Sequence, residues 1–493
     1  MGRARDIILA GLALPGAWPA LAQPFSIRPD AGADPSALAI TVFASGLNYP
    51  HGMVMLDDGS LLVATSRPVS GGSFFNSTGE IVRLVDADED GVADGPPAVV
   101  AAGLPGSLVD IRRIGGAGGA GGAGGLLLAA STAAGAESIR VLRLGAAGSD
   151  PLVEVGAIEF ALAPGTIHKP SALAARPSPG VAGAWDVFFQ IGSRNNADAT
   201  TDPAIVSGLV TGTAPQDALW KVTIVDDGAA VSGFGLEQIG AGLRNAAGIA
   251  LHPTTGDLYH VDNGIDGPDG ESLSADELNV IRAIDIGGAI EHFGFPDTYV
   301  EYRTGVVVGS TGLPALATFQ PLPDPFTDAE SEGAAAIVFA PPCFPAAVRG
   351  GAFVSFHGRF SLAGLANEEN PLVFVNPATG VHAHFIGPDE PAIGHLDGLL
   401  ATENALYAAD LSSAGSLSTG AGTGVIYRIG LAPAPCDLDG APGVTVFDLL
   451  AYLGLWFAGD AAAELTGDDP ASVDVFDLLA YLACWFERSG PCG

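Results

Sequence analysis

Acidic residues at alternate positions are the first candidates for chemistry. The run Asp86-Ala-Asp88-Glu-Asp90-Gly91-Val-Ala-Asp94 places carboxylates two residues apart, followed by a turn glycine. Oxygen atoms at this spacing converge on one hard cation, and calcium prefers such ligands. The run therefore predicts a calcium-stiffened loop, with a solvated acidic turn as the alternative.

Two further acidic loops lie near the C-terminus. The first has EF-hand spacing, although Ala441 and Pro442 stand at its fifth and sixth positions. The second is two residues longer, around Pro470. We expect calcium in both, or else a calcium-independent helical pair held by packing. The ligands would be Asp437, Asp439 and Asp448 in the first loop, and Glu464, Thr466, Asp468, Asp474 and Asp477 in the second.

Polar side chains also recur just before or just after short apolar strands. Basic residues are scarce, with 20 Lys and Arg against 55 Asp and Glu, so an arginine in such a place is notable. In a closed array of strands the loops at one end surround the axis, and ligand sites form there. We expect these side chains to converge: His51, Asp110, His168, Arg194, Asn195, Arg244, Asn245, Asp262, Asn263, His357, Arg359, His395 and Asp397.

These residues flank a repeated strand–turn–strand unit. In its clearest copy, Gly242–Gly270, two apolar strands (Gly248–Leu251 and Leu258–Val261) enclose a turn. A third strand follows each unit, and a fourth follows each of the first five. The other copies are Asn48–Ser66, Gly106–Thr132, Lys169–Ser193, Gly333–Gly358 and Leu396–Ser412.

The sixth unit has no fourth strand after it. The strand Ile40–Leu47 precedes the first unit and can supply the missing strand, which closes a radial array and removes its free edges. The sequence therefore predicts an all-β, six-bladed β-propeller over residues 38–430. Unrelated β-sandwiches would not repeat the strand types in one order.

The remainder of the chain has a different pattern. After a linker over residues 431–435, VFDLLAYL occurs at Val446–Leu453 and again at Val475–Leu482. Each copy starts an amphipathic helix, with apolar residues at helical spacing. We expect a small α-helical domain of two paired helices over residues 436–493.

The N-terminus indicates an exported protein. Arg3, Arg5, the apolar run Ile7–Leu14 and Ala20-Leu21-Ala22 are typical of a signal peptide over residues 1–22. No later stretch is long and apolar enough for a membrane span. A net charge of −35 argues against nucleic acid and anionic membranes as partners. We therefore expect a secreted, periplasmic or cell-surface protein.

The four cysteines are Cys343, Cys436, Cys484 and Cys492. Export makes disulfides possible, and four cysteines allow three connectivities. A bridge from Cys492 to either Cys436 or Cys484 would close the tail on itself. Cys343 is expected to be a buried free thiol.

The tail resembles the dockerin modules. The matching segments are DLDG, ELTGD and the duplicated VFDLLAYL, within about 58 residues that end in a WF pair and a cysteine. Dockerins bind cohesin partners through the surface of such helices. The resemblance implies a cohesin-like protein partner and attachment to a cell surface or complex.

The propeller resembles the soluble PQQ-dependent glucose/sorbosone dehydrogenases, which are six-bladed propellers. The matching segments are GLRNAAGIALHPTTGDLYHVDNG, DELNVIRAIDIGGAIEHFGFPD, AFVSFHGRF and IHKPSALAARPSPG. The resemblance covers most of residues 38–430. It implies oxidation of a sugar or another polyhydroxy compound, with PQQ and calcium as cofactors.

The same resemblance implies roles for particular residues. His168 matches the catalytic histidine, which takes the hydroxyl proton while hydride moves to PQQ. Arg244 and Asn245 match residues that hold PQQ oxygens, and His357 and Arg359 stand where the family has a cofactor-binding lysine. Gly264 and Ile265 match the carbonyl pair that holds the PQQ calcium, and Glu277 matches an acid of a second calcium site.

Departures from the family pattern keep other functions open. Ile167 replaces an acid directly before His168, and His395 and Asp397 replace an arginine pair. PQQ is a tricarboxylate, so the exchange of two arginines for His395 and Asp397 removes favourable contacts to it. This favours a propeller that binds carbohydrate or protein ligands without redox chemistry. A third possibility is a metal-dependent lactonase on the same architecture, with Asn263 and Asp262 among its ligands.

Overall fold

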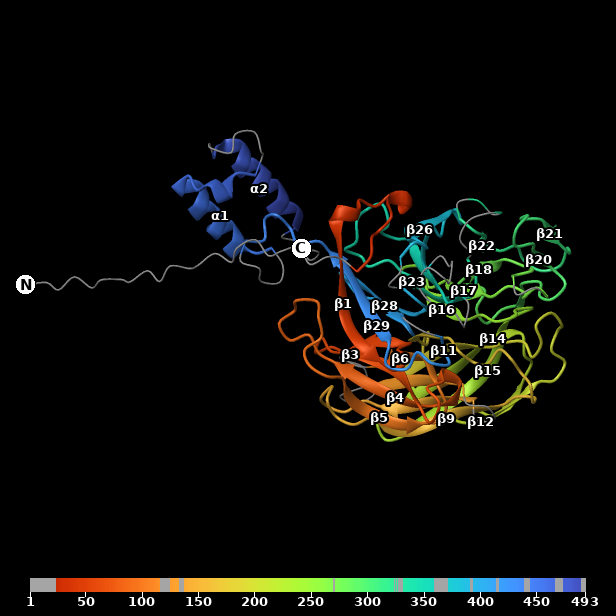
Figure 1. The fold of residues 1–493 in the computed structure, drawn as a ribbon. Coiled ribbons are helices and arrows are strands. Elements are labelled where there is room, and N and C mark those ends of the chain that lie inside the picture. The colour runs from red at the N-terminus through yellow and green to blue at the C-terminus, as the bar shows by residue number, and fades with distance from the viewer. Residues whose placement is uncertain are drawn as a thin grey trace, which may run out of the picture.

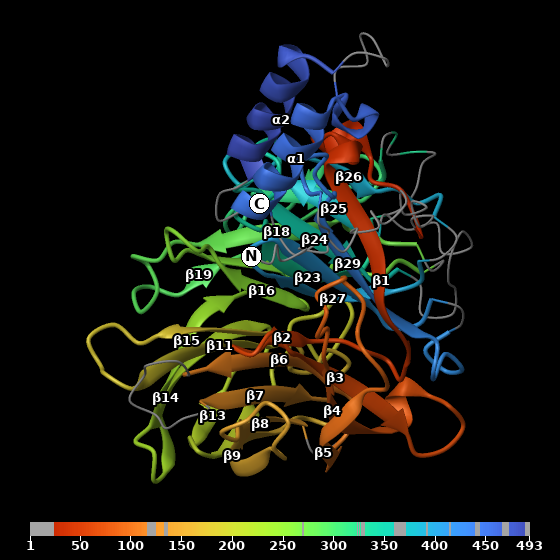
Figure 2. The ribbon, with the colours of Figure 1, turned by 90° about the vertical axis from the view of Figure 1, so that its left-hand side faces the viewer.

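The computed structural model describes residues 24–115, 125–132, 137–268, 271–322, 324, 326, 331–358, 371–390, 393–413, 416–438, 444–465 and 473–488. Within these residues, six sheets of four or more strands form a propeller, and two α-helices follow near the C-terminus (Figures 1 and 2). The prediction of an all-β, six-bladed propeller with a small helical domain is confirmed.

Each of the first three blades has four antiparallel strands that pair in the order of the chain. Blade one consists of β2 (Met53–Met55), β3 (Leu61–Pro68), β4 (Ser77–Leu84) and β5 (Ala98–Leu104). Blade two consists of β6 (Leu108–Ile114), β7 (Leu126–Ser131), β8 (Glu137–Arg143) and β9 (Val153–Ala161). Blade three consists of β10 (Leu173–Pro177), β11 (Ala184–Ile191), β14 (Ala218–Asp226) and β15 (Val231–Ala241).

The last three blades follow the same plan. Blade four consists of β16 (Gly248–Leu251), β17 (Leu258–Asp262), β18 (Asp276–Ile281) and β22 (Ala317–Phe319). Blade five consists of β23 (Ala334–Phe339), β24 (Ala352–Phe356), β25 (Leu372–Val375) and β26 (His382–Ile386). Blade six consists of β27 (Leu396–Ala401), β28 (Ala405–Asp410), β29 (Gly424–Leu431) and β1 (Leu38–Leu47).

The ring closes through β1, the N-terminal strand. β1 runs antiparallel to β29, with Leu38 opposite Leu431 and Leu47 opposite Gly424. The predicted closing strand, Ile40–Leu47, lies within it. The first strands of the blades lie side by side in chain order, and β27 returns to β2. Apolar side chains of neighbouring blades pack between the sheets, because side chains of a strand alternate between its two faces.

Short strands that the sequence did not predict tie some blades together. β12 (Ala204–Gly208) and β13 (Gly212–Ala214) leave blade three and extend blade two by pairing with β9. β19 (Glu291–His292) pairs in parallel with β15. β20 (Tyr299–Val300) and β21 (Val307–Val308) form a separate hairpin. Short 3-10 turns are η1 (Pro29–Ala31), η2 (Pro35–Ala37), η3 (Phe74–Asn76) and η5 (Ala461–Ala463).

The tail contains α1 (Val446–Ala458) and α2 (Val475–Arg488), which lie outside the ring of blades (Figure 1). Thr445 and Asp448 form a capping box at the start of α1. The rings of Tyr452 and Tyr481, one from each copy of VFDLLAYL, stack with centroids 3.8 Å apart. The duplicated sequence therefore builds a shared core from equivalent residues.

The cysteine predictions are wrong. Cys436 forms a disulfide with Cys484, so neither pairs with Cys492, which lies outside the described residues. Cys343 is disulfide-bonded and is not a free thiol. Cys343 is only 4% exposed. Because half-cystines are often as buried as free thiols, expected burial could not separate the two states.

In the described part of the chain, no helix combines the length and the apolar character that a bilayer span requires. The predicted signal peptide lies outside the described residues, and export stays a prediction.

Candidate active site

A cavity of about 590 Å³ lies at one end of the propeller axis. Its lining comes from segments of all six blades, and it joins residues far apart in the sequence. Eight of the predicted rim residues or cofactor residues line it: His51, His168, Arg244, Asn245, Asn263, Gly264, His357 and Asp397. Phe74, Val109, Leu411 and Leu417 add an apolar side.

His168 lies on the connection from β9 to β10, with Nδ1 2.8 Å from Ser193 Oγ. Ser193 Oγ donates its single proton to the carbonyl oxygen of Asn195 at 2.6 Å. His168 Nδ1 must therefore be the donor, and Nε2 carries the lone pair. Burial, together with the charge of Arg244, lowers the pKa of His168 to about 3. Near neutral pH the ring is an uncharged acceptor.

Asp262 positions Arg244 and Asn245. It is the last residue of β17, and its carboxylate accepts the backbone N–H of Arg244 at 3.0 Å and of Asn245 at 2.6 Å. Burial raises the pKa of Asp262 to about 8, against the effect of these two amides. The two hydrogen bonds give Asp262 a positioning role for the backbone of Arg244 and Asn245.

The side chains of Arg244 and Asn245 are also oriented. Arg244 donates from Nε and Nη2 to Asn196, at 3.0 and 2.7 Å, and pairs with Asp266. Its Nη1 makes no hydrogen bond to any residue in the described ranges. Asn245 Nδ2 donates to Asn263 Oδ1 at 2.8 Å. This wall can donate to oxygen atoms of a ligand, because a guanidinium recognises carboxylate and carbonyl groups.

Another part of the wall is built from histidines and a carboxylate. His357 Nδ1 lies 2.7 and 2.9 Å from the two oxygens of Asp397. Although burial opposes ionisation, the charges of His357, His51 and His395 hold the pKa of Asp397 below its usual range. Burial lowers the pKa of His51 to about 4. This wall therefore presents a buried negative charge where the family resemblance implies two arginines.

The predicted calcium site of the cofactor is only partly available. The carbonyl oxygen of Ile265 accepts the N–H groups of Leu273 and Ser274, at 2.7 and 3.2 Å, which uses both of its lone pairs. Glu277 accepts from Asn279 Nδ2 at 3.2 Å, and burial raises its pKa to about 7. Glu277, Gly264 and Ile265 line a void of about 20 Å³ that adjoins the main cavity, because Gly264 lines both.

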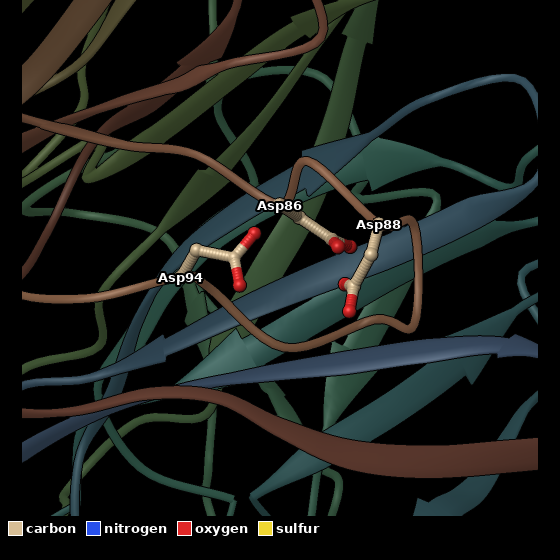
Figure 3. Close-up of side chains that lie close together, drawn as sticks. All are labelled: Asp86, Asp88 and Asp94. Carbon is tan, nitrogen blue, oxygen red and sulfur yellow. The ribbon is translucent and has the colours of Figure 1, made fainter.

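The acidic loop of blade one gathers three of its four predicted ligands. Carboxylate oxygens of Asp86, Asp88 and Asp94 lie within 4.8 Å of one another and point into the space that the loop encloses (Figure 3). Asp90 instead accepts the N–H of Val92 at 2.8 Å. Burial, followed by the charges of Asp90 and Asp88, raises the pKa of Asp86. A bound cation would relieve this repulsion.

In the tail, the carboxylate at the end of each predicted calcium loop accepts backbone N–H groups of its own loop. Asp448 is fully buried and accepts the N–H groups of Leu438 and Thr445, at 2.8 and 2.7 Å. Asp477 accepts the equivalent groups of Leu465 and Asp474, both at 2.8 Å. Asp437, Glu464 and Asp474 lie in the described part of these loops. Asp439 and Asp468, like Arg359 of the cavity prediction, lie outside the described residues.

Other predicted rim residues point elsewhere. Asp110 pairs with Arg112 at 2.8 Å and Arg194 pairs with Asp202 at 2.7 Å, and neither Asp110 nor Arg194 lines the cavity. Sequence reasoning missed Ser193, Asn196 and Phe74. Ser193 and Asn196 follow β11 directly, so their place after a second strand was an available signal. Phe74 lies on the long connection between β3 and β4, where no sequence pattern indicates a cavity residue.

Comparisons with known proteins give no family for this chain. No family model matches. An uncharacterised protein of Borreliella burgdorferi is 42% identical over 60 residues, which is 12% of this chain and 14% of that protein. The chain thus matches about a seventh of the length of this curated relative.

Solved structures with a similar arrangement include PQQ-domain and glucose dehydrogenase-like proteins. The PQQ domain of pyranose dehydrogenase from Coprinopsis cinerea has 14% identity and a TM-score of 0.48, covering 85% of this chain and 99% of that one. A Trichoderma reesei enzyme of carbohydrate-active family AA12 has 16% identity and 0.47, covering 84% and 99%. A Thermus thermophilus putative oxidoreductase (glucose dehydrogenase) has 17% identity and 0.45, covering 80% and 99%. At these values the likeness assigns no activity to this chain.

Proposed function

We propose that the axial cavity binds a sugar or another polyhydroxy compound and that the protein oxidises it as a PQQ-dependent dehydrogenase. The observation that carries this proposal is the convergence of His168, Arg244, Asn245 and Asn263 on one cavity of about 590 Å³. A histidine base beside oxygen-binding groups suits removal of a hydroxyl proton.

His168 is the residue that takes this proton. Its Nδ1 is held by Ser193, so Nε2 accepts, and the ring stays neutral because burial and Arg244 disfavour its cation. A ligand anion that pairs with Arg244 would offset part of this charge effect and make His168 a stronger base. Phe74 and Leu417 give the cavity an apolar side that can pack against the carbon atoms of a ligand.

The wall formed by Arg244, Asn245 and Asn263 fits the oxygens of PQQ. Arg244 Nη1 has no hydrogen bond within the described residues, and both asparagines are amide groups at the cavity surface. These residues would hold the cofactor, with the carbonyl of Gly264 as a candidate calcium ligand. When bound, PQQ supplies a quinone that accepts a hydride equivalent.

Reconstitution tests the proposal. The purified protein is mixed with PQQ and calcium, and dye reduction is measured over a panel of sugars and polyols. We expect a PQQ-dependent absorption spectrum and turnover, and His168→Ala should keep the spectrum while losing about 10²–10⁴-fold in turnover. No PQQ-dependent spectrum together with no dye reduction would refute the enzyme.

A binding protein without redox chemistry is the second candidate. It is favoured by Asp397, a buried carboxylate that repels a tricarboxylate from the cavity wall. In that case calorimetry should detect sugar binding without PQQ, and PQQ should neither bind nor change the sugar affinity.

Calcium at the blade-one loop, and a dockerin-like role of the exported tail, are further parts of the proposal. Support comes from the gathered oxygens of Asp86, Asp88 and Asp94 and from exposed apolar residues on both tail helices, such as Phe447 and Phe476. Calorimetry of the tail with calcium tests its loops. If calcium produces no heat of binding and a chelator does not change the melting temperature, the proposal of calcium in the tail is refuted.

A further inference from the structure

His51 lies at the inner end of the axial cavity, and the proposed function gives it no role. Like Asp397, it lines both the cavity of about 590 Å³ and a narrow void of about 20 Å³. That void is also lined by Ile337 and Leu399, which lie farther along β23 and β27 than the residues of these strands that line the cavity. A ligand that fills the cavity to its inner end therefore meets His51.

The backbone of His51 is held by close contacts with the neighbouring blades. A Cβ on Gly398 of β27 would lie 2.0 Å from the carbonyl oxygen of His51, so only glycine allows this approach. A Cβ on Gly52 would lie 2.3 Å from the backbone nitrogen of Ile111 in β6. The N–H of His51 donates to the carbonyl oxygen of Ala64 at 2.9 Å. The His51 side chain is thus carried by a rigid part of the fold, as a binding site requires.

Tyr49 fixes the chain just before His51. Its φ of 48° is left-handed, which is uncommon for a bulky residue. Its side chain is fully buried, and its hydroxyl makes hydrogen bonds with the carbonyl oxygens of Gly72 and Leu417. Backbone strain of this kind persists only where the surroundings hold it, and it gathers at functional sites. Two loops of different blades therefore hold the turn that leads to His51.

The ring of His51 differs from those of the other two histidines that line the cavity. Nδ1 of His168 lies 2.8 Å from Ser193 Oγ, and Nδ1 of His357 lies 2.9 and 2.7 Å from the oxygens of Asp397. The ring of His51 makes no hydrogen bond to any residue that the structure describes, and the residue keeps part of its surface exposed. The tautomer of His51 is therefore set by the group that occupies the cavity.

Near neutral pH the ring of His51 is uncharged. Burial, partly opposed by the charge of Asp397, lowers the pKa of His51 to about 4. A neutral imidazole has one donor and one acceptor, and a hydroxyl group has the same pair, so the two can bond in either direction. A carboxylate of a ligand would instead meet the charge of Asp397, whose pKa lies below its usual range.

We propose that His51 is a specificity-determining residue of the axial cavity, which binds a hydroxyl group of an uncharged sugar or polyol. Sugar acids are poor ligands, because a carboxylate at this position lies near Asp397. This inference rests on the proposed function for its polyhydroxy ligand, and it narrows that class to neutral compounds.

Calorimetry of the full chain tests this role with D-glucose, sorbitol, glycerol and D-glucuronate. D-glucuronate differs from D-glucose only by a carboxylate in place of the terminal hydroxymethyl group, and we expect at least about tenfold weaker binding of the acid. His51→Phe keeps an aromatic ring without hydrogen-bonding atoms and should lower the affinity for neutral compounds at least about tenfold. His51→Gln keeps a donor and an acceptor and should stay within about threefold of the native affinity. The control His292→Phe, at an exposed histidine, should bind as the native protein does.

Nuclear magnetic resonance of the native chain with 15N-labelled histidine gives a second measurement, which needs no folded variant. In the free protein the ring nitrogens of His51 should average over both tautomers, and saturation with a neutral compound should shift them.

The outcomes separate the inference from the proposed function. If the native chain binds none of the neutral compounds, the polyhydroxy ligand is refuted and the inference fails with it. If a neutral compound binds but leaves the His51 signals unchanged, or binds His51→Phe equally well, the inference is overturned and the proposed function stands. Equal affinities for D-glucose and D-glucuronate also overturn it.

Discussion

Two histidines with the same lowered pKa show why geometry must accompany a pKa shift. Burial lowers the pKa to about 3 for both His168 and His260. His168 has a hydrogen-bonded Nδ1 and lines a cavity, so its lone pair can meet a ligand. His260 is fully buried against Phe293, and neither ring nitrogen has a hydrogen-bond partner within the described structure. The first histidine can meet a ligand, and the second is a cost to stability.

His260 predicts an acid sensitivity. Its folded pKa is near 3, whereas an unfolded histidine titrates near 6.5, so the unfolded chain binds the extra proton between these values. Relative to its value above about pH 6.5, the stability of the fold therefore falls as the pH drops toward 3, by up to about 1.4 kcal/mol per pH unit. His260→Leu should remove the share of this dependence that His260 contributes and stabilise the fold by about 1–2 kcal/mol at pH 7.

Urea denaturation at pH 7 and pH 5 measures both effects of this substitution. His292→Leu, at an exposed histidine, is the control and should keep the native pH dependence. An unchanged difference between the two pH values in His260→Leu would contradict the argument.

At the scale of elements, blades four and six hold their rim residues through a carboxylate at the end of the second strand. Asp262 ends β17 and Asp410 ends β28, and each binds the two successive amides that precede the first strand of its blade. The same backbone arrangement thus presents Arg244 and Asn245 in blade four and His395 in blade six. A repeated fold can therefore carry different chemistry on equivalent positions.

Loss of this strand-end carboxylate should damage the site more than the blade. In Asp262→Ala two buried amides lose their acceptor, which costs about 1–3 kcal/mol, and Arg244 loses its backbone anchor. We expect a lower melting temperature and at least tenfold weaker binding of the ligand to the cavity. Asp57→Ala breaks an exposed pair with Arg113 and should cost less than about 1 kcal/mol with unchanged binding. Equal effects of the two variants would count against a positioning role for Asp262.

The sequence predicted those elements whose signals are local. The strands β17 and β24 are short apolar runs between turn residues, and the duplicated VFDLLAYL marks both helices. β12 and β19 were missed because each is short and forms only by pairing with a distant strand. At the site, His168 and Arg244 were found through their position at strand ends. Phe74 and the pairing of His357 with Asp397 depend on contacts between blades, which no local pattern encodes.

At the scale of the whole molecule, the acidic loop lies where the ring closes. Gly91 accepts a hydrogen bond from Thr41 at 3.0 Å, and the N–H of Ala93 donates to Phe43 at 2.8 Å, so the loop of blade one rests on β1. A cation held by Asp86, Asp88 and Asp94 would stiffen the contact between the first blade and the last.

Calcium removal should therefore lower the stability of the whole propeller. We expect a chelator to lower the melting temperature, since a ligand at 100 times its Kd adds about 2.7 kcal/mol. Asp88→Asn should abolish the chelator effect, while Asp57→Asn should keep it. If the chelator effect persists in Asp88→Asn, the responsible ion lies elsewhere. If a chelator has no effect on the native chain, the prediction of calcium in this loop is wrong.

The pairing of β1 with β29 also determines when the ring can close during biosynthesis. Leu38 is made early, but its partner Leu431 is made only after nearly all of the propeller has been translated. At about 5–20 residues per second, the ribosome needs roughly 20–80 s to cover that interval. Throughout this time β1 is an unpaired strand that can pair wrongly with other chains. Cotranslational folding can build the inner blades, but the ring can lock only after translation has passed the last blade.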